Sequence, residues 1–337
     1  MLYLIKVLYQ KINKLALVKI ILKTIEELIK GTSLNLLAKE GDRLSRLYRH
    51  RDRRELKALS TDLERLAYIS LRLPSTYAVV CKVLKELLAT GISLFSLLDI
   101  GAGPGTVLLA SEEALFPLKK ATLVERDPGF IRLGKRLCEK VLGAEQKWVC
   151  QDVTKSLPYE LHDLVVASYF LNEIKEEKRF PLIEQLWNAT GQFLVIIEPG
   201  NREGFSFLMS IREHLLLLGG YLLAPCPHTN KCPLGKGDWC HFSARLERSS
   251  LQRKVKGATL NYEDEKFSYL IFSRTPLKRC SSRVIKRPLL HKGFVRLSLC
   301  ASLGIEEKIV TKKTKILYSS LKKMQWGEAC EAQLDGV

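Results

Sequence analysis

From residue 94 to residue 273 the sequence alternates short apolar segments with helical ones, and this alternation constrains the fold more than any other feature. Strands that alternate with helices form βαβ units, in which consecutive strands run parallel and helices cover the sheet. The pattern therefore predicts an α/β domain with a mainly parallel, doubly wound sheet. The expected strands are Leu94–Ile100, Ala121–Glu125, Lys147–Cys150, Asp163–Ser168, Phe193–Glu198 and Phe267–Ser273.

A glycine-rich turn joins the first expected strand to the following helix. It reads Asp99-Ile100-Gly101-Ala102-Gly103-Pro104-Gly105. Glycines at such a turn allow a ligand to approach the backbone closely at the start of a helix. The spacing G-x-G-x-G, with an acid two residues before the first glycine, differs from the G-x-G-x-x-G of dinucleotide enzymes. It resembles motif I of class I S-adenosylmethionine-dependent methyltransferases.

Two further acids stand where that resemblance expects them. Glu125 ends the second strand, where an acidic side chain can accept hydrogen bonds from both ribose hydroxyls. Asp152 follows the third strand, where such methyltransferases use an acid near the adenine amino group. We therefore expect a set of cofactor-binding residues for S-adenosylmethionine: Asp99, Gly101, Gly103, Gly105, Glu125 and Asp152.

The segment after the fourth strand, Ser168–Glu173, does not identify the methyl acceptor. It has none of the prolines of the polar-Pro-Pro-aromatic element with which many amino-methylating enzymes hold the target nitrogen. Asn172 and Glu173 either border the site or simply start a helix. Methyl transfer depends mostly on positioning, so the missing element does not exclude catalysis, and the catalytic residues stay unassigned.

A Cys/Pro/Gly/His segment at 225–243 interrupts the alternation. It contains Cys226-Pro227-His228, Cys232-Pro233 and Trp239-Cys240-His241-Phe242. Soft thiolates on a bent loop suit zinc or an iron–sulfur cluster. A zinc ion would be completed by His228 or His241, whereas a cubane cluster would take a fourth cysteine from elsewhere, with Cys280 and Cys300 available. The spacing lacks the paired C-x₂-C of a zinc ribbon, which favours the cluster.

The charge of the chain is concentrated in three stretches. The chain carries 54 Lys and Arg against 36 Asp and Glu, a net charge of +18. Residues 43–57, 229–257 and 276–323 have net charges of +5, +5 and +11. Basic surfaces of this kind bind polyanions, either nucleic acid or an anionic membrane surface. An isolated acidic run, Tyr262–Glu265, is expected to neutralise nearby Arg and Lys or to orient the cysteine loop, and we favour a structural role.

The first 90 residues predict helices. Helical spacing is kept by Leu56, Leu59, Leu63, Leu66 and Ala67, and Ser60 or Thr61 can act as a local cap. Met1–Ile29 is apolar with lysines at helical spacing, which predicts an amphipathic packing helix, with a membrane-surface helix as the alternative. It has neither a cleavage site nor Arg or Ser, and no uncharged apolar run reaches the ~18–20 residues that span a bilayer.

The later motifs resemble those of a known family. They are Cys-Pro-His…Cys-Pro…Trp-Cys-His-Phe, Tyr-Glu-Asp-Glu-Lys-Phe-Ser-Tyr at 262–269, Leu-Cys at 299–300 and Trp-Gly at 326–327. With Arg72–Ala78, they resemble the ribosomal small-subunit-associated methyltransferase-like family, over roughly residues 40–330. The resemblance implies a class I methyltransferase core and a [4Fe–4S] cluster. By the family pattern the ligands are Cys226, Cys232, Cys240 and Cys300.

The resemblance implies a monomeric assembly factor that binds the small ribosomal subunit, or its precursor, and its 16S-type rRNA. An active rRNA methyltransferase is the alternative; a small-molecule methyltransferase with a structural zinc site is disfavoured by the charge. We expect a bacterial cytoplasmic protein, or alternatively one of the mitochondrial matrix. The expected organisation is an N-terminal helical region at 1–90, the methyltransferase-like domain at 91–275 with the cysteine insertion at 225–243, and a basic, β-rich C-terminal extension at 276–337.

Overall fold

The computed structural model divides the chain into two compact units. It describes residues 17–50, 61–114, 116–139, 143–155, 159–235, 237–256 and 259–331. The first unit comprises residues 1–191 and 244–265, and the second comprises residues 192–243 and 266–337. No helix in the described ranges is both long enough and apolar enough to cross a bilayer.

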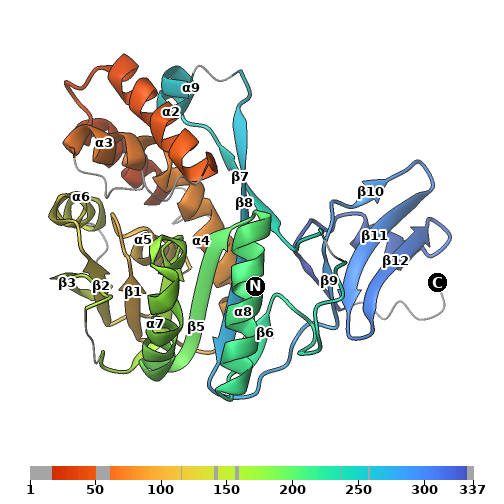
Figure 1. Cartoon of the computed structure of the whole chain (residues 1–337). Coiled ribbons are helices and arrows are strands. Elements are labelled where there is room, and N and C mark those ends of the chain that lie inside the picture. Colours follow the sequence, from red (N-terminus) through yellow and green to blue (C-terminus); the bar gives the residue numbers. More distant parts are fainter. Residues whose placement is uncertain are drawn as a thin grey trace. The chain divides into compact units, whose positions relative to one another are not determined.

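Helices form one side of the first unit (Figure 1). Residues 17–28 are helical and bury Ile21 and Ile25, as expected of a packing helix, while residues 1–16, with Lys6, Lys11 and Lys14, lie outside the described residues. Next come α2 (Leu34–His50), α3 (Asp62–Leu71) and α4 (Leu73–Leu88), and much later α9 (Ser250–Lys256). Helices α2, α3 and α9 share an apolar core that contains Leu37, Leu44, Ala67, Leu71 and Val255.

The boundaries of these helices follow from local chemistry. Thr61 caps α3, because its side chain accepts from the Glu64 amide while the Glu64 carboxylate accepts from the Thr61 amide. This reciprocal capping box confirms the predicted cap. Pro74 stands in the first turn of α4, where a missing amide hydrogen costs no helical bond.

A parallel sheet forms the other part of the first unit. Its strands are β1 (Ser96–Ile100), β2 (Lys120–Glu125), β3 (Glu145–Cys150) and β4 (His162–Ser168), in the order β3-β2-β1-β4. Helix α5 (Thr106–Glu113) follows β1 and α6 (Pro128–Cys138) follows β2, whereas no described helix lies between β3 and β4; after β4 come the short helix η1 (Leu171–Glu173) and α7 (Glu176–Asn188). The parallel register places the carboxyl ends of β1, β2 and β3 at one edge. At that edge an α/β sheet binds its ligands.

The second unit begins with antiparallel pairing. It contains β5 (Thr190–Pro199), α8 (Arg202–Leu217), β6 (Tyr221–Ala224) and most of β8 (Tyr262–Ser273). Strand β8 pairs antiparallel with both β5 and β6, so these strands make the arrangement mixed rather than purely parallel. The helical crossover α8 keeps β5 and β6 parallel to each other, and the later strand β8 fills the space between them.

A separate antiparallel sheet follows in the second unit. It consists of β9 (Ser282–Val284), β10 (Leu289–Leu290), β11 (Phe294–Ala301), β12 (Gly304–Thr311) and β13 (Ala329–Cys330). The predicted strand before Cys300 is confirmed as β11, which extends through Cys300. Helix α10 (Lys315–Leu321) packs on one face of this sheet. The cysteine segment lies between β6 and β7 (Phe242–Glu247).

The acidic run at 262–265 has the structural role that the sequence predicts. Each of its three carboxylates pairs with basic side chains of the first unit: Glu263 with Arg248 and Lys256, Asp264 with Arg245, and Glu265 with Arg72.

Candidate functional site

The glycine loop lies at the carboxyl edge of the parallel sheet, between β1 and α5. Gly101, Gly103 and Gly105 all have positive φ, at 68°, 52° and 81°. A Cβ at Gly101 would lie 2.3 Å from the Phe170 ring, so this position requires glycine. A Cβ at Gly103 would have no described atom within 4 Å, so the space beside Gly103 is open to a ligand.

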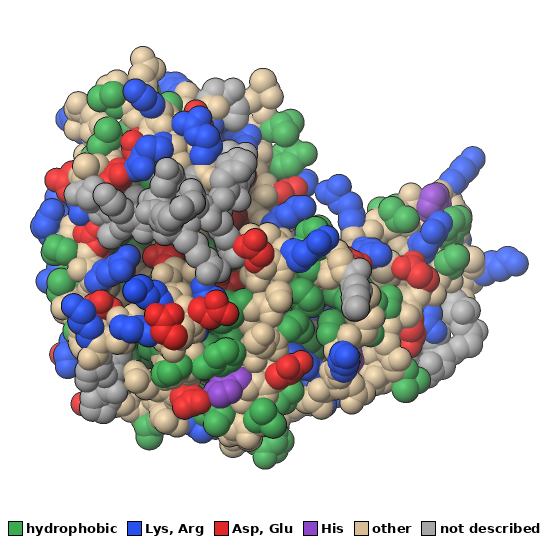
Figure 2. All heavy atoms as spheres, viewed as in Figure 1, with side chains coloured by type: hydrophobic (Ala, Val, Ile, Leu, Met, Phe, Trp, Pro, Cys, Tyr) green, Lys and Arg blue, Asp and Glu red, His purple; other side chains and the backbone are tan. Residues whose placement is uncertain are grey.

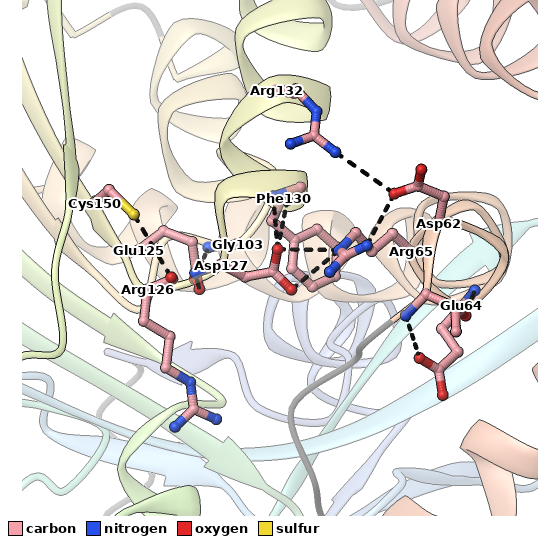
Figure 3. Close-up of polar contacts among 12 residues, drawn as sticks. Asp62, Glu64, Arg65, Gly103, Glu125, Arg126, Asp127, Phe130, Arg132 and Cys150 are labelled. Carbon is pink, nitrogen blue, oxygen red and sulfur yellow. Dashed lines mark hydrogen bonds and ion pairs between the residues drawn. The ribbon is translucent and has the colours of Figure 1, made fainter.

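Glu125 is fixed beside this loop at the end of β2 (Figure 3). Its Oε2 accepts a hydrogen bond of 2.9 Å from the Gly103 amide, and its Oε1 accepts one of 2.8 Å from the Asp127 amide. Burial raises the pKa of this carboxyl, and the two amides oppose that rise. A carboxylate oxygen has more than one lone pair, so each oxygen can still accept from a hydroxyl.

Asp99 is the most deeply buried of the predicted residues. Its side chain is 1% exposed, and its Oδ2 has no hydrogen-bond partner among the described residues. Burial, and then the charge of Glu125, raise the pKa of Asp99 well above its ordinary value. A buried polar atom without a partner is costly, and a donor on a bound ligand would satisfy it.

Asp152 lies in the loop after β3 and is half-buried. Its Oδ1 accepts hydrogen bonds from the Thr154 amide and hydroxyl, at 2.9 and 2.8 Å. These two bonds lower the pKa of Asp152. Because both bonds use Oδ1, Oδ2 remains available to an amino group.

Glu173, at the end of η1, adds a fourth carboxyl to this edge. Burial raises its pKa to about 7, although the Arg126 guanidinium, 4.0 Å away, opposes the rise. Just before it, Tyr169 has a φ of 56°, an uncommon conformation for a residue other than glycine. The sequence does not decide whether Glu173 borders the site; its contact with Arg126, the residue after Glu125, favours that interpretation.

A polar network that the sequence did not predict holds the start of α6 (Figure 3). Asp127 caps α6 by accepting from the Gly129 and Phe130 amides, and both its oxygens accept from Arg65 Nε at 3.0 Å. Arg65 comes from α3, so this network ties the helical region to the loop that carries Glu125. A local sequence pattern cannot predict this contact, because Arg65 and Asp127 are 62 positions apart in the sequence.

The four cysteines assigned through the family pattern line one cavity in the second unit. Cys226, Cys232 and Cys240 reach it from the loop between β6 and β7, and Cys300 reaches it from β11. Burial, followed by the neighbouring thiols, raises the pKa of Cys300 to about 12 and that of Cys240 well above its ordinary value. Since all four thiols line the same cavity, they lie close to one another. Cys280 interacts with Cys300 in the same way but is not part of the cavity wall.

Two deeply buried arginines complete the wall of this cavity. Arg212, from α8, donates to the carbonyl oxygens of His228 and Asn230, at 3.0 and 2.8 Å. Its Nε has no partner in the described part of the chain. Arg283, from β9, donates to the carbonyl oxygen of Pro225 at 2.9 Å. The sequence reasoning missed both arginines, although Arg212 interrupts the apolar face of α8, which is an observable signal.

The two histidines that flank the cysteines have different surroundings. His228 lines the cavity, with its Nε2 3.5 Å from Cys300 Sγ and its buried Nδ1 without a partner among the described atoms. His241 is packed between Trp239 and Trp326, with ring centroids 5.3 and 4.8 Å away. Within the described ranges, no three His, Cys, Asp or Glu side chains have the arrangement that a single metal ion requires.

Comparison with known proteins places the chain in a family. A family model described as "Mitochondrial small ribosomal subunit Rsm22" matches residues 62–331. The chain belongs to the Rsm22 family. This confirms the resemblance to a ribosomal small-subunit-associated family.

Curated relatives of this Rsm22 chain are longer than it is. Human "Ribosome assembly protein METTL17, mitochondrial" is 27% identical, across 78% of this chain and 61% of the human protein. Fission yeast "Rsm22-cox11 tandem protein 2, mitochondrial" is 26% identical, across 80% of this chain and 43% of the yeast protein. The chain thus spans about half the length of these relatives.

A solved methyltransferase structure also matches. The N-methyltransferase NodS from Bradyrhizobium japonicum, in complex with S-adenosyl-L-homocysteine, aligns with a TM-score of 0.42 and 12% identity. The alignment covers 64% of this chain and 93% of the NodS chain.

The opposite environments of Asp99 and Asp152 predict opposite effects of pH on stability. Because the pKa of Asp99 is raised on folding, ionisation of this group disfavours the folded state as the pH rises from about 4 toward its folded pKa. Asp99→Asn should therefore stabilise the protein at pH 8, by about 1 kcal/mol or more, and less at pH 4. Urea denaturation across this pH range measures the difference.

Asp152→Asn serves as the matched control. The pKa of Asp152 is lowered on folding, so its charge stabilises the folded state above the unfolded pKa and ceases to do so as the pH falls. Asp152→Asn should destabilise the protein at pH 8 and approach wild type in acid. If Asp99→Asn changed the free energy of unfolding equally at all pH values, ionisation of the buried Asp99 carboxyl would not destabilise the folded state.

Proposed function

We propose that this chain is an assembly factor of the small ribosomal subunit that binds its rRNA. In this proposal the first unit holds S-adenosylmethionine and the second holds a [4Fe–4S] cluster. The observation that carries the proposal is the Rsm22 family match over residues 62–331. The relatives' names state ribosome assembly, and the net charge of +18 fits a polyanionic partner such as rRNA.

The residues at the carboxyl edge of the first sheet fit S-adenosylmethionine. Glu125 keeps acceptor capacity for hydroxyls, and Asp99 has a buried oxygen without a described partner. The open space beside Gly103 leaves room for the ligand. When bound, S-adenosylmethionine supplies a methyl group on a cationic sulfonium, which carboxylates at this edge would stabilise.

The cavity of the second unit fits an anionic iron–sulfur cluster. Four thiols line it, and the buried Arg212 guanidinium has only neutral carbonyl oxygens and the Cys226 thiol as partners in the described part of the chain. A buried cation needs a compensating anion. A [4Fe–4S] core with four thiolate ligands carries net negative charge, which Arg212 and Arg283 would balance, and its potential responds to such neighbours.

Zinc fits this cavity less well. A zinc ion holds its ligands at about 2.0–2.3 Å, so they must converge on one point. The described thiols and His228 have no such arrangement. A cubane cluster spreads its four ligands around a larger core, which agrees with cysteines drawn from the loop and from β11. This geometry also weakens the alternative of a small-molecule methyltransferase with structural zinc.

One observation favours an active rRNA methyltransferase as the second candidate function. Glu173 has a pKa of about 7 and lies at the cofactor edge, after β4. A carboxyl with a pKa near the working pH can accept a proton from a methyl acceptor. Transfer of labelled methyl groups from S-adenosylmethionine to immature subunits, lost in Glu173→Gln, would distinguish this function from assembly alone.

The names of the relatives also support a proposal for the compartment. The curated relatives carry "mitochondrial" in their names, which favours the mitochondrial matrix over the bacterial cytoplasm.

The assembly function predicts association with immature small subunits. The full chain should co-sediment with small-subunit precursors on a sucrose gradient, and less with mature subunits. Raising the salt concentration should release it, because salt cations compete with Lys and Arg for the phosphates. Equal distribution between precursor and mature particles, or absence from both, would contradict the assembly function.

The cofactor site predicts a specific loss of affinity in Gly103→Arg. The new side chain would occupy the open space beside the loop, so the affinity for S-adenosylmethionine should fall at least about a hundredfold by calorimetric titration. Gly91→Arg is the matched control, because Gly91 also has positive φ, 71°, and open surroundings, but lies in the turn after α4. Wild-type affinity in a folded Gly103→Arg variant would remove this loop from the site.

A further inference from the structure

Beyond the cysteine cavity, one face of the second unit's C-terminal sheet is left uncovered by the described residues. Along β11, Val295, Leu297 and Leu299 are buried in a core against Val310 and Leu321. Successive side chains of a strand point to opposite faces, so the alternate residues of β11 lie on the other face. We call the part of it beyond the cysteine cavity the open face; it comprises Phe294, Arg296 and Ser298 of β11, Leu289 of β10, and Glu307 and Ile309 of β12.

The open face combines exposed apolar side chains with a guanidinium. Arg296 is exposed and lies directly opposite Leu289 on β10 and Ile309 on β12. Leu289 and Ile309 are 48% and 49% exposed, far more than side chains covered by protein. The acid of this face, Glu307, accepts a hydrogen bond from Ser298, so it has a local partner.

An aromatic pair stands at the far end of the open face, in the turn between β10 and β11. The rings of His291 and Phe294 are stacked, with centroids 4.4 Å apart and planes inclined by 21°. A backbone bond of 2.9 Å from the His291 amide to the Phe294 carbonyl oxygen fixes the turn. His291 is exposed while Phe294 is half-buried, so the imidazole forms the outer layer of the stack.

Cations surround this aromatic pair. Lys292 lies in the same turn, and Lys312 is held next to it by a 3.0 Å bond from its amide to the Gly293 carbonyl oxygen. Residues 276–323 carry 13 Lys and Arg but only two acids. Figure 2 shows Lys and Arg side chains projecting from this part of the surface, with hydrophobic side chains between them.

We propose that the open face binds single-stranded RNA. An unpaired base would stack on the His291–Phe294 pair, further bases would cover Leu289 and Ile309, and the phosphates would contact Arg296, Lys292 and Lys312. Stacking on aromatic rings within a basic surface is how proteins bind single strands, whereas a duplex conceals the faces of its bases. The inference rests on the proposed function for RNA as the partner, and it adds the form of RNA and the site.

An anionic membrane is the competing occupant, since it also attracts lysines and apolar side chains. It does not require stacked rings. Membrane binding would depend instead on Leu303, which is 95% exposed at the β11–β12 turn, outside the open face.

The test measures binding of the full chain to a fluorescent RNA of about 12 nucleotides, within the size that such sheets cover. Fluorescence anisotropy measures the affinity of the protein for this single-stranded RNA and for a duplex of the same sequence. His291→Ala/Phe294→Leu should weaken single-strand binding about tenfold or more, with little change for the duplex and an unchanged salt slope. Lys292→Gln/Lys312→Gln should instead lower the log–log salt slope, by about 0.7 for each phosphate that the variant no longer neutralises. Leu303→Ser is the control and should bind RNA like wild type.

Two results would overturn the inference. The first is wild-type single-strand affinity in the folded aromatic double variant. The second is binding to phosphatidylserine vesicles that Leu303→Ser abolishes, with no single-strand binding by wild type. In either case, continued co-sedimentation of wild type with subunit precursors would leave the proposed function intact, whereas loss of co-sedimentation would contradict that function itself.

Discussion

Two buried guanidiniums, those of Arg212 and Arg283, shape the second unit of this Rsm22 protein. Arg212 holds the start of the cysteine loop to α8 through the His228 and Asn230 carbonyl oxygens, and Arg283 holds the residue before Cys226 to β9. Both cations are almost fully removed from water, which is costly without a neighbouring anion. In the proposed function, the four thiols of the same cavity would supply that anion as deprotonated ligands of a cluster, so the arginines and the cysteines would act as one structural element.

This element connects segments that are far apart in the sequence. Cys226, Cys232 and Cys240 come from one loop, whereas Cys300 lies on β11, whose open face continues from the cavity to the His291–Phe294 pair. When cluster binding orders a protein, the free energy of binding adds to the free energy of folding. The proposed cluster would therefore stabilise the sheet on which we propose that RNA binds. The cofactor edge of the first unit is built separately, from the loops that follow β1, β2 and β3.

Much of the first unit was predictable, because its signals are local. The alternating pattern predicted the strands, Thr61 predicted a helix start, and the spacing from Gly105 to Glu125 predicted two groups that meet at one sheet edge. The antiparallel pairing of β8 was not predictable from a pattern of alternation, since strand direction depends on which partners a strand meets. The contacts of Arg65 with Asp127 and of Arg283 with Pro225 also had no local signal, because long-range partners are chosen by tertiary packing.

The most direct test is the iron and sulfide content of anaerobically purified protein. Wild type should contain about four of each per chain. Cys300→Ser should lose both and make residues 225–323 sensitive to protease, while Gly101–Gly105 keeps its ligand. Cys280→Ser should keep the cluster, because serine can still accept the bond that Arg283 donates to Cys280 Sγ. Full iron in Cys300→Ser, or a single zinc without sulfide in wild type, would contradict the account.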